Sequence, residues 1–101
     1  MTMYAGETVV ITHVATNETV ELTDADVDAV YIEIFDSAGD VVVAETEMTW
    51  DDTQERWEYV WNTGGATPID SGSYRALCTI DGLGGTLNWE YKKIRLARNP
   101  V

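Results

Sequence analysis

The sequence predicts an all-β fold, and three observations carry this prediction. Short segments rich in Val, Ile, Thr and aromatic residues recur along the chain, several of them alternating apolar with polar positions. Clusters of Gly, Asp, Ser and Asn separate these segments roughly every 8–12 residues, which is the spacing of strands joined by turns. No stretch shows the apolar period of a long helix. We therefore expect about seven strands in a single domain spanning residues 1–101, since a chain of this length suits one core.

The first half of the chain contains three predicted strands. The first lies at residues 8–14, a segment dominated by β-branched side chains. The second lies at residues 29–35, where strict alternation predicts one buried face and a wetter face that carries Glu33. A turn over residues 36–40, in which Gly39 is free to take a positive φ, leads into the third. In the second strand, Val30, Ile32 and Ile34 are expected to form the buried face.

The second half contains the remaining strands. A turn over residues 51–56 precedes a strand at 57–61, in which the aromatic residues alternate and share one face. After a longer loop that contains two adjacent glycines and a proline, the next strand spans residues 73–80. A glycine-rich turn then leads into the last strand, at residues 86–97.

Charge is distributed unevenly along the chain. The net charge is −12; residues 1–55 contain fourteen of the 18 acidic side chains and none of the six basic ones. Four of the basic residues lie within residues 92–101. Nucleic acid is therefore not an expected partner, because like charge repels phosphates. The basic end is suited to an acidic neighbour, including another copy of this protein. Two lysines against 18 acids are typical of proteins from a salt-rich cytoplasm.

Cysteine usage and hydropathy bound the location of the protein. Cys78 is the only cysteine, so no intrachain disulfide can form. The N-terminus has neither a basic region nor an apolar core of the kind found in signal peptides. No stretch approaches the roughly 20 apolar residues of a membrane-spanning helix. We expect a soluble protein made in a cytoplasm, with no membrane partner.

Two segments carry a family resemblance. Residues 70–76, DSGSYRA, resemble the tyrosine corner of immunoglobulin-like domains, D-x-G-x-Y-x-C. Residues 6–13, GETVVITH, resemble the start of strand B in the same domains, G-x-x-V-x-I-x-C. The resemblance implies an immunoglobulin-like β-sandwich of about seven antiparallel strands. It also implies a sandwich with no disulfide, because His13 and Ala76 stand at the two bridge positions, and one without the strand C tryptophan.

A second resemblance concerns biology. Acidic immunoglobulin-like domains that begin at their own Met, lack a signal peptide and end in a basic strand resemble accessory structural proteins of tailed viruses. Such proteins decorate the capsid or sit at the neck and tail. The resemblance implies a location in the virion, after synthesis in the cytoplasm of a host that is here expected to be salt-loving. The implied partners are other virion proteins, of the capsid, neck or tail, and copies of the chain itself.

Catalysis is not expected. His13 is the only histidine, and no motif places a nucleophile or an orienting acid beside it, so we expect a half-buried sheet residue. Cys78 shares a strand face with Tyr74 and Ala76 and is expected to be a small core hydrophobe. No phosphate loop, zinc spacing or nucleophile elbow is present, and no cofactor is expected.

Residues 22–28 contain the only weak candidates for a metal site. Asp24, Asp26 and Asp28 resemble half of a calcium loop, but the glycine and the distal glutamate of an EF-hand are missing. We expect a single capped turn instead, with Thr23 as N-cap and Asp26 three residues on.

Aromatic and basic residues are the best functional candidates. The aromatic residues exceed what one small core must hold, so some should be exposed and anchor an interface. The last strand adds positive charge beside them and is a candidate docking edge, through strand addition or salt links to an acidic partner. A carbohydrate-binding module is the alternative, because exposed aromatic faces also stack on sugar rings. The docking hypothesis predicts that a chain lacking residues 92–101 folds but no longer docks. The candidate interaction residues are Trp57, Tyr59, Trp61, Trp89, Tyr91, Lys92, Lys93, Arg95 and Arg98.

Overall fold

The structure is a computed structural model that describes residues 3–17, 20–65, 68–82 and 85–98. These residues form ten strands and no helix. The strands are β1 (Met3–Tyr4), β2 (Thr8–His13), β3 (Thr16–Asn17), β4 (Val20–Glu21), β5 (Ala29–Phe35), β6 (Val41–Glu47), β7 (Thr49–Asp51), β8 (Arg56–Asn62), β9 (Gly72–Gly82) and β10 (Gly85–Ala97).

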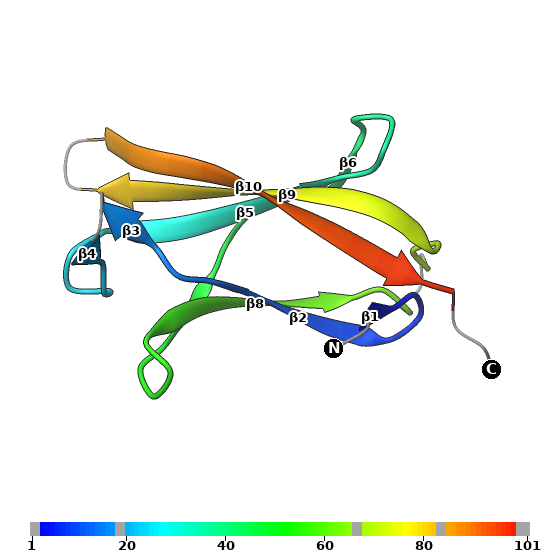
Figure 1. Cartoon of the computed structure of the whole chain (residues 1–101), viewed down its shortest axis with the longest axis horizontal. Coiled ribbons are helices and arrows are strands. Elements are labelled where there is room, and N and C mark those ends of the chain that lie inside the picture. Colours follow the sequence, from blue (N-terminus) through cyan, green and yellow to red (C-terminus); the bar gives the residue numbers. More distant parts are fainter. Residues whose placement is uncertain (1–2, 18–19, 66–67, 83–84, 99–101) are drawn as a thin grey trace.

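Eight of these strands form two sheets that pack face to face (Figure 1). The larger sheet has the order β1-β10-β9-β5-β6, and the smaller has the order β2-β8-β7. The short β1 runs parallel to β10, whereas all other pairs in the two sheets are antiparallel. Strands β3 and β4 form a separate two-stranded ribbon. The predicted immunoglobulin-like β-sandwich is confirmed. The described residues form ten strands, more than the seven expected, because β1, β3 and β4 are too short to leave a pattern in the sequence.

Side-chain alternation determines which face of each strand is buried. In β5 the predicted inward residues Val30, Ile32 and Ile34 are fully buried, and Glu33 lies on the half-buried outer face, as predicted. The same alternation runs through β9, where Tyr74, Ala76, Cys78 and Ile80 are buried. Because successive side chains point to opposite faces, each of these strands gives one row to the core and one to the outer surface.

The chain crosses from the larger sheet to the smaller at Met48. Strand β6 pairs with β5, and β7, which is separated from β6 by Met48 alone, pairs with β8 in the other sheet. The Met48 side chain is buried at the crossing, and its backbone N–H donates a 2.7 Å hydrogen bond to the Val30 carbonyl. The sequence predicted strand here but not the crossing, because both segments have the same local pattern.

The predicted tyrosine corner is present at the entrance to β9. The Tyr74 hydroxyl donates a 2.6 Å hydrogen bond to the Asp70 carbonyl, four residues upstream. The Tyr74 ring also packs edge-on against Trp61 of the smaller sheet, with centroids 5.4 Å apart. This single side chain therefore anchors the loop before β9 and joins the two sheets.

A buried threonine connects the turn before β2 with the loop after β8. The Thr63 hydroxyl accepts a hydrogen bond from the Gly6 N–H and donates one to the Glu7 carbonyl. The two backbones approach so closely that a Cβ on Gly64 would lie 2.3 Å from the Gly6 oxygen. Glycine at position 64 is therefore required by the contact and not only by the turn.

Two aspartates organise the hairpin turns. Asp36 Oδ1 accepts the backbone N–H groups of Ala38 and Asp40, and Gly39 has the predicted positive φ, at 91°. In the turn between β7 and β8, Asp51 Oδ1 accepts hydrogen bonds from the backbone N–H groups of Thr53 and Gln54. These hydrogen bonds hold the pKa of Asp51 below its usual value. Both predicted turns are therefore confirmed, and each is built on a side-chain-to-backbone hydrogen bond.

Removal of the corner hydrogen bond should destabilise the domain without changing its fold. For Tyr74→Phe we expect the free energy of unfolding to fall by about 1 kcal/mol, because a part-buried carbonyl loses its donor. Urea denaturation measures the change, with Tyr31→Phe, a half-exposed tyrosine of β5, as the control that should lie within about 0.5 kcal/mol of the wild type. Equal effects of the two variants would contradict a structural role for the corner.

Candidate interaction surface

From Trp89 to Arg95, alternate residues of β10 project from the outer face of the larger sheet. Ile94 and Leu96 point inward and are buried, so the residues between them point outward. Trp89 and Tyr91 are 60% and 48% exposed. We call the outward row and its cross-strand neighbour the aromatic–basic strip; it consists of Trp89, Tyr91, Lys93 and Arg95 of β10 with Arg75 of β9.

The rings and one cation of the strip contact each other in sequence. Trp89 and Tyr91 pack edge-on, with centroids 5.6 Å apart and planes at 77°. The Arg75 guanidinium carbon lies 5.5 Å from the Tyr91 ring centroid, within the range of a cation–π interaction. The aromatic and basic parts of the strip therefore form one continuous surface.

The basic part of the strip places like charges side by side. In the β9–β10 register Arg75 lies directly opposite Lys93, and Arg95 follows two residues later on the same face of β10. A like-charged pair in this position destabilises a sheet by roughly 0.2–1 kcal/mol. Residues directly opposite Arg95 and on the far side of Arg75 are Ser73 and Phe35, neither of which is acidic. This arrangement suits a negatively charged ligand or partner.

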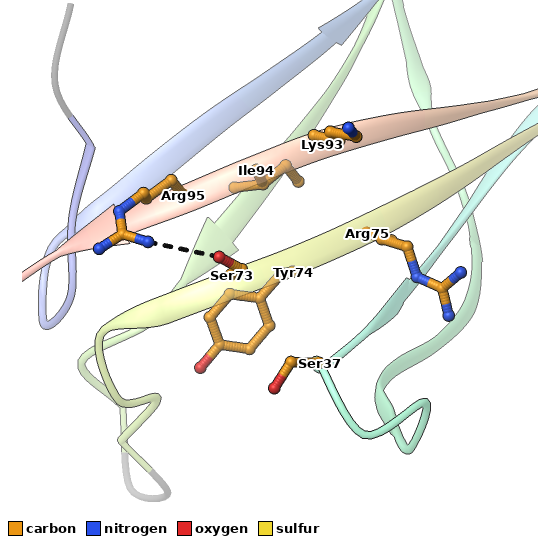
Figure 2. Close-up of a pocket in the computed structure, with 7 residues that line it drawn as sticks. All are labelled: Ser37, Ser73, Tyr74, Arg75, Lys93, Ile94 and Arg95. Atoms are coloured by element: carbon orange, nitrogen blue, oxygen red, sulfur yellow. Dashed lines mark hydrogen bonds between the residues drawn. The ribbon is translucent and has the colours of Figure 1, made fainter.

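The three cations surround a hollow of about 500 Å³ (Figure 2). Its walls include the hydroxyl side chains of Ser73 and of Ser37, which comes from the β5–β6 turn. Arg95 Nη1 donates a 3.4 Å hydrogen bond to Ser73 Oγ, which keeps the guanidinium at one end of the hollow, while Arg75 lies at the other. Guanidinium groups bind carboxylate, sulfate and phosphate oxygens in pairs.

A smaller hollow of about 240 Å³ lies at the aromatic end of the strip. It is lined by Trp89 and Tyr91 and by Leu77 and Thr79, the residues opposite them on β9. An aromatic hollow therefore adjoins the hollow that the three cations line.

The structure places two of the predicted aromatic interaction residues in the core and a third partly against it. Trp57 and Trp61 are each only 3% exposed and belong to the core, and Tyr59 is half-buried against it. The prediction that these residues form a binding face is wrong for the two tryptophans. In this sandwich, which has neither a disulfide nor a strand C tryptophan, the large side chains that fill the space between the sheets come from β8.

Two predicted basic residues lie away from the strip. Lys92 is half-buried on the inward side of β10, where its charge acts on His13 and Cys78. Arg98 is exposed beside a separate hollow that Gly6 and Asp70 also line. The run of basic residues is thus divided by the pleat of the strand. Removal of residues 92–101 would also delete the core residues Ile94 and Leu96, so the prediction that such a chain folds is wrong.

Arg75 is the functional candidate that the sequence interpretation missed. It points outward from β9, but nothing local relates it to residues 89–95. Only the hairpin register, which sets Arg75 opposite Lys93 and Leu77 opposite Tyr91, brings them together. Counting back from the glycine-rich turn would have set Arg75 opposite Lys92, because a β-bulge between Thr86 and Asn88 shifts the register by one residue.

The only cysteine and the only histidine of the chain are both buried. Cys78 is fully buried, as predicted, and burial raises the pKa of its thiol to about 11. His13 is 2% exposed and not half-buried as predicted, and its Nδ1 atom has no hydrogen-bond partner within the described residues. Burial, aided by the Lys92 charge, lowers the pKa of His13. Both side chains are therefore neutral and shielded from solvent at neutral pH.

The weak metal candidates form a capped turn. Asp26 Oδ2 accepts a 2.9 Å hydrogen bond from the Thr23 N–H, and the Thr23 hydroxyl accepts one from the Ala25 N–H, as the capping prediction requires. Asp24, Asp26 and Asp28 are exposed, and in the described part of the chain no three acidic, His or Cys side chains are grouped to hold a metal ion. The described residues also include no helix able to cross a membrane.

Comparison with known proteins finds no match: no family model, curated protein or solved structure is significantly similar to the chain. The class of the protein therefore rests on its own architecture. It is an immunoglobulin-like β-sandwich without a disulfide, with an aromatic–basic strip on the outer face of its larger sheet.

The buried histidine should make stability depend on pH below neutrality. Because the folded state holds the pKa of His13 below 6.5, only the unfolded state gains a proton as the pH falls from 6.5, and stability is lost until the folded pKa is reached. We expect a slope of at most about 1.4 kcal/mol per pH unit in this window. Denaturation of wild type and His13→Leu between pH 6.5 and 5 tests this. A variant with the wild-type slope would contradict the assignment, since no other histidine is present.

Proposed function

We propose that this protein is a non-enzymatic docking domain that binds an acidic partner through the aromatic–basic strip. The observation that carries the proposal is the side-by-side placement of Arg75 and Lys93, next to Arg95, in a chain of net charge −12. Three cations placed side by side oppose the overall charge and cost stability, which a partner's carboxylates or other anions would offset.

The aromatic end of the strip supports the same proposal. Trp and Tyr are enriched among the residues that dominate interface energies, and here two of them are exposed and packed against each other. Their mutual contact and the Arg75 contact restrict the rings before any partner arrives, which lowers the entropy cost of binding.

The absence of an enzymatic role is part of the proposal. The single histidine and the single cysteine are buried and neutral, and the residues that line the largest hollow of the strip include no His, Cys, Asp or Glu. This lining favours binding over bond-breaking chemistry.

We further propose that the docking takes place in a virion, where the protein is a capsid decoration or neck and tail component. The support is the resemblance to accessory proteins of tailed viruses together with a surface built for attachment. Exposed acidic residues in the turns at residues 23–28 and 51–55 give the molecule a hydrated surface, as expected for a host with a salt-rich cytoplasm.

Carbohydrate binding is the second candidate, and one observation favours it. The 240 Å³ hollow beside Trp89 and Tyr91 is shallow, apolar and adjacent to cations, as in a site for a sugar ring that carries an acid group. A glycan-binding assay separates the two candidates, because a sugar site would depend on the rings more than on Arg95 at the far end of the strip.

Charge reversal on the strip should abolish docking and leave the fold intact. In Lys93→Glu/Arg95→Glu both substituted side chains are exposed, so the domain should fold, whereas capture of the native partner from source material and co-sedimentation with virus particles should fall at least tenfold. Trp89→Ala should weaken docking in the same assays.

Arg98→Glu is the matched control, since it reverses an exposed basic residue of the same chain end outside the strip. Equal loss in this control would show that net charge, and not the strip, determines docking. Retained capture by the strip variant would disprove the proposed site.

Salt should stabilise the folded domain. Raising KCl from about 0.1 to about 1 M shortens the Debye length from about 10 to about 3 Å and screens the repulsion among the acidic residues. We expect Tm to rise over this range, and to rise less in Asp24→Asn/Asp28→Asn/Glu45→Gln, which removes three exposed acids. A Tm that is independent of KCl would argue against adaptation to a salt-rich cytoplasm.

A further inference from the structure

In the part of the chain that the structure describes, β2 is an edge strand without the usual protective devices. In the smaller sheet it pairs with β8 on one side only. Its sequence, TVVITH, contains no charged residue, proline or glycine. Such an edge presents a row of backbone N–H and C=O groups that are available to another extended chain.

The other edges in the described part of the chain are protected. Strand β6 carries Glu45 and Glu47, and its register with β5 is shifted twice. Strands β1 and β7 have only two and three residues. The part of β10 that lies beyond its pairing with β1 carries Glu90, Lys92 and Lys93. Short length, charge and irregular register all discourage strand addition, so β2 is the exception.

The sheet face beside this edge is apolar. Val10 of β2 and Val60 of β8 lie directly opposite each other on the outer face and are 51% and 59% exposed. Val14, just after β2, is also exposed. Two exposed valines side by side on a sheet add buried area to any strand that pairs with β2.

Charge indicates which partner fits. Residues 8–17 contain no Asp, Glu, Lys or Arg, although residues 1–55 contain fourteen acids. Two copies with a net charge of −12 each can therefore meet along β2 without placing like charges directly opposite each other. A basic segment from another protein would find no carboxylate on this strand to pair with.

We propose that β2 pairs antiparallel with β2 of a second copy of this chain, which joins the two three-stranded sheets into one of six strands. Such an interface is isologous and closes on itself as a two-fold dimer. Pairing centred on Val10 sets Val9 opposite Ile11 and Thr8 opposite Thr12, so inward residues face inward ones. A shift by one residue would break this match. The exposed valines of one copy, Val10 and Val60, then lie next to those of the other copy on the same face of the joined sheet.

A cysteine at the two-fold axis tests this geometry. In Val10→Cys the two thiols would lie about 4.5–5.5 Å apart at their Cβ atoms, so mild oxidation should produce a covalent dimer. Val41→Cys is the matched control, because Val41 is 54% exposed but lies on β6. The native Cys78 is buried and should not react. Cross-linking of the Val10 variant that is no faster than that of the control would overturn the proposal.

Sedimentation of the variants provides a second measurement. The wild type in about 1 M KCl, where repulsion is screened, should show a concentration-dependent dimer. Val10→Lys should be monomeric, because two lysines would then lie opposite each other, whereas Val41→Lys should dimerise. A monomeric wild type at the highest attainable concentration would overturn the proposal. Lys93→Glu/Arg95→Glu leaves β2 unchanged and should dimerise as the wild type does. The proposed dimer and the proposed docking surface are therefore tested independently of each other.

Discussion

The contact between Trp61 and Tyr74 is the interaction on which the rest of this structure depends. The two rings meet across the sandwich, one from each sheet, in a fold that has neither a disulfide nor a strand C tryptophan. Tyr74 is also bound to the Asp70 carbonyl, so the same side chain that joins the sheets determines where β9 begins. An aromatic contact of this kind is non-covalent, and it needs close packing of the aliphatic rows on either side to hold its geometry.

The position of the interaction surface follows from that anchoring. Once Tyr74 points inward, alternation directs Ser73 and Arg75 outward, and the hairpin register places Arg95 and Lys93 beside them. The basic cluster is therefore a consequence of core packing on the opposite side of the same strands. Its cost in like-charge repulsion is modest compared with the burial of Ile94 and Leu96, which explains how the fold can carry three adjacent cations.

The two proposed contact regions lie on opposite faces of the molecule. The aromatic–basic strip is on the outer face of the five-stranded sheet, whereas Val10 and Val60 are on the outer face of the three-stranded sheet. Pairing through β2 would thus leave the strip of each copy accessible. A dimer with two strips would bind a repeated acidic surface, such as an array of identical subunits, more tightly than one copy does, because the second contact is intramolecular.

Local sequence patterns were sufficient for the fold class, the buried row of β5, the tyrosine corner and the capped turn at Thr23. Each of these depends on residues close together in the chain, through alternation or through a hydrogen bond that spans a few residues. Tertiary structure alone decided which aromatic residues are core, because Trp57, Trp61 and Trp89 occupy strands of similar local pattern and differ only in what packs against them. It also decided that Arg75 joins the strip while Lys92 does not, and that β2 lacks a second neighbour. Strand pairing determines these features, and it joins residues far apart in the chain that no local pattern relates.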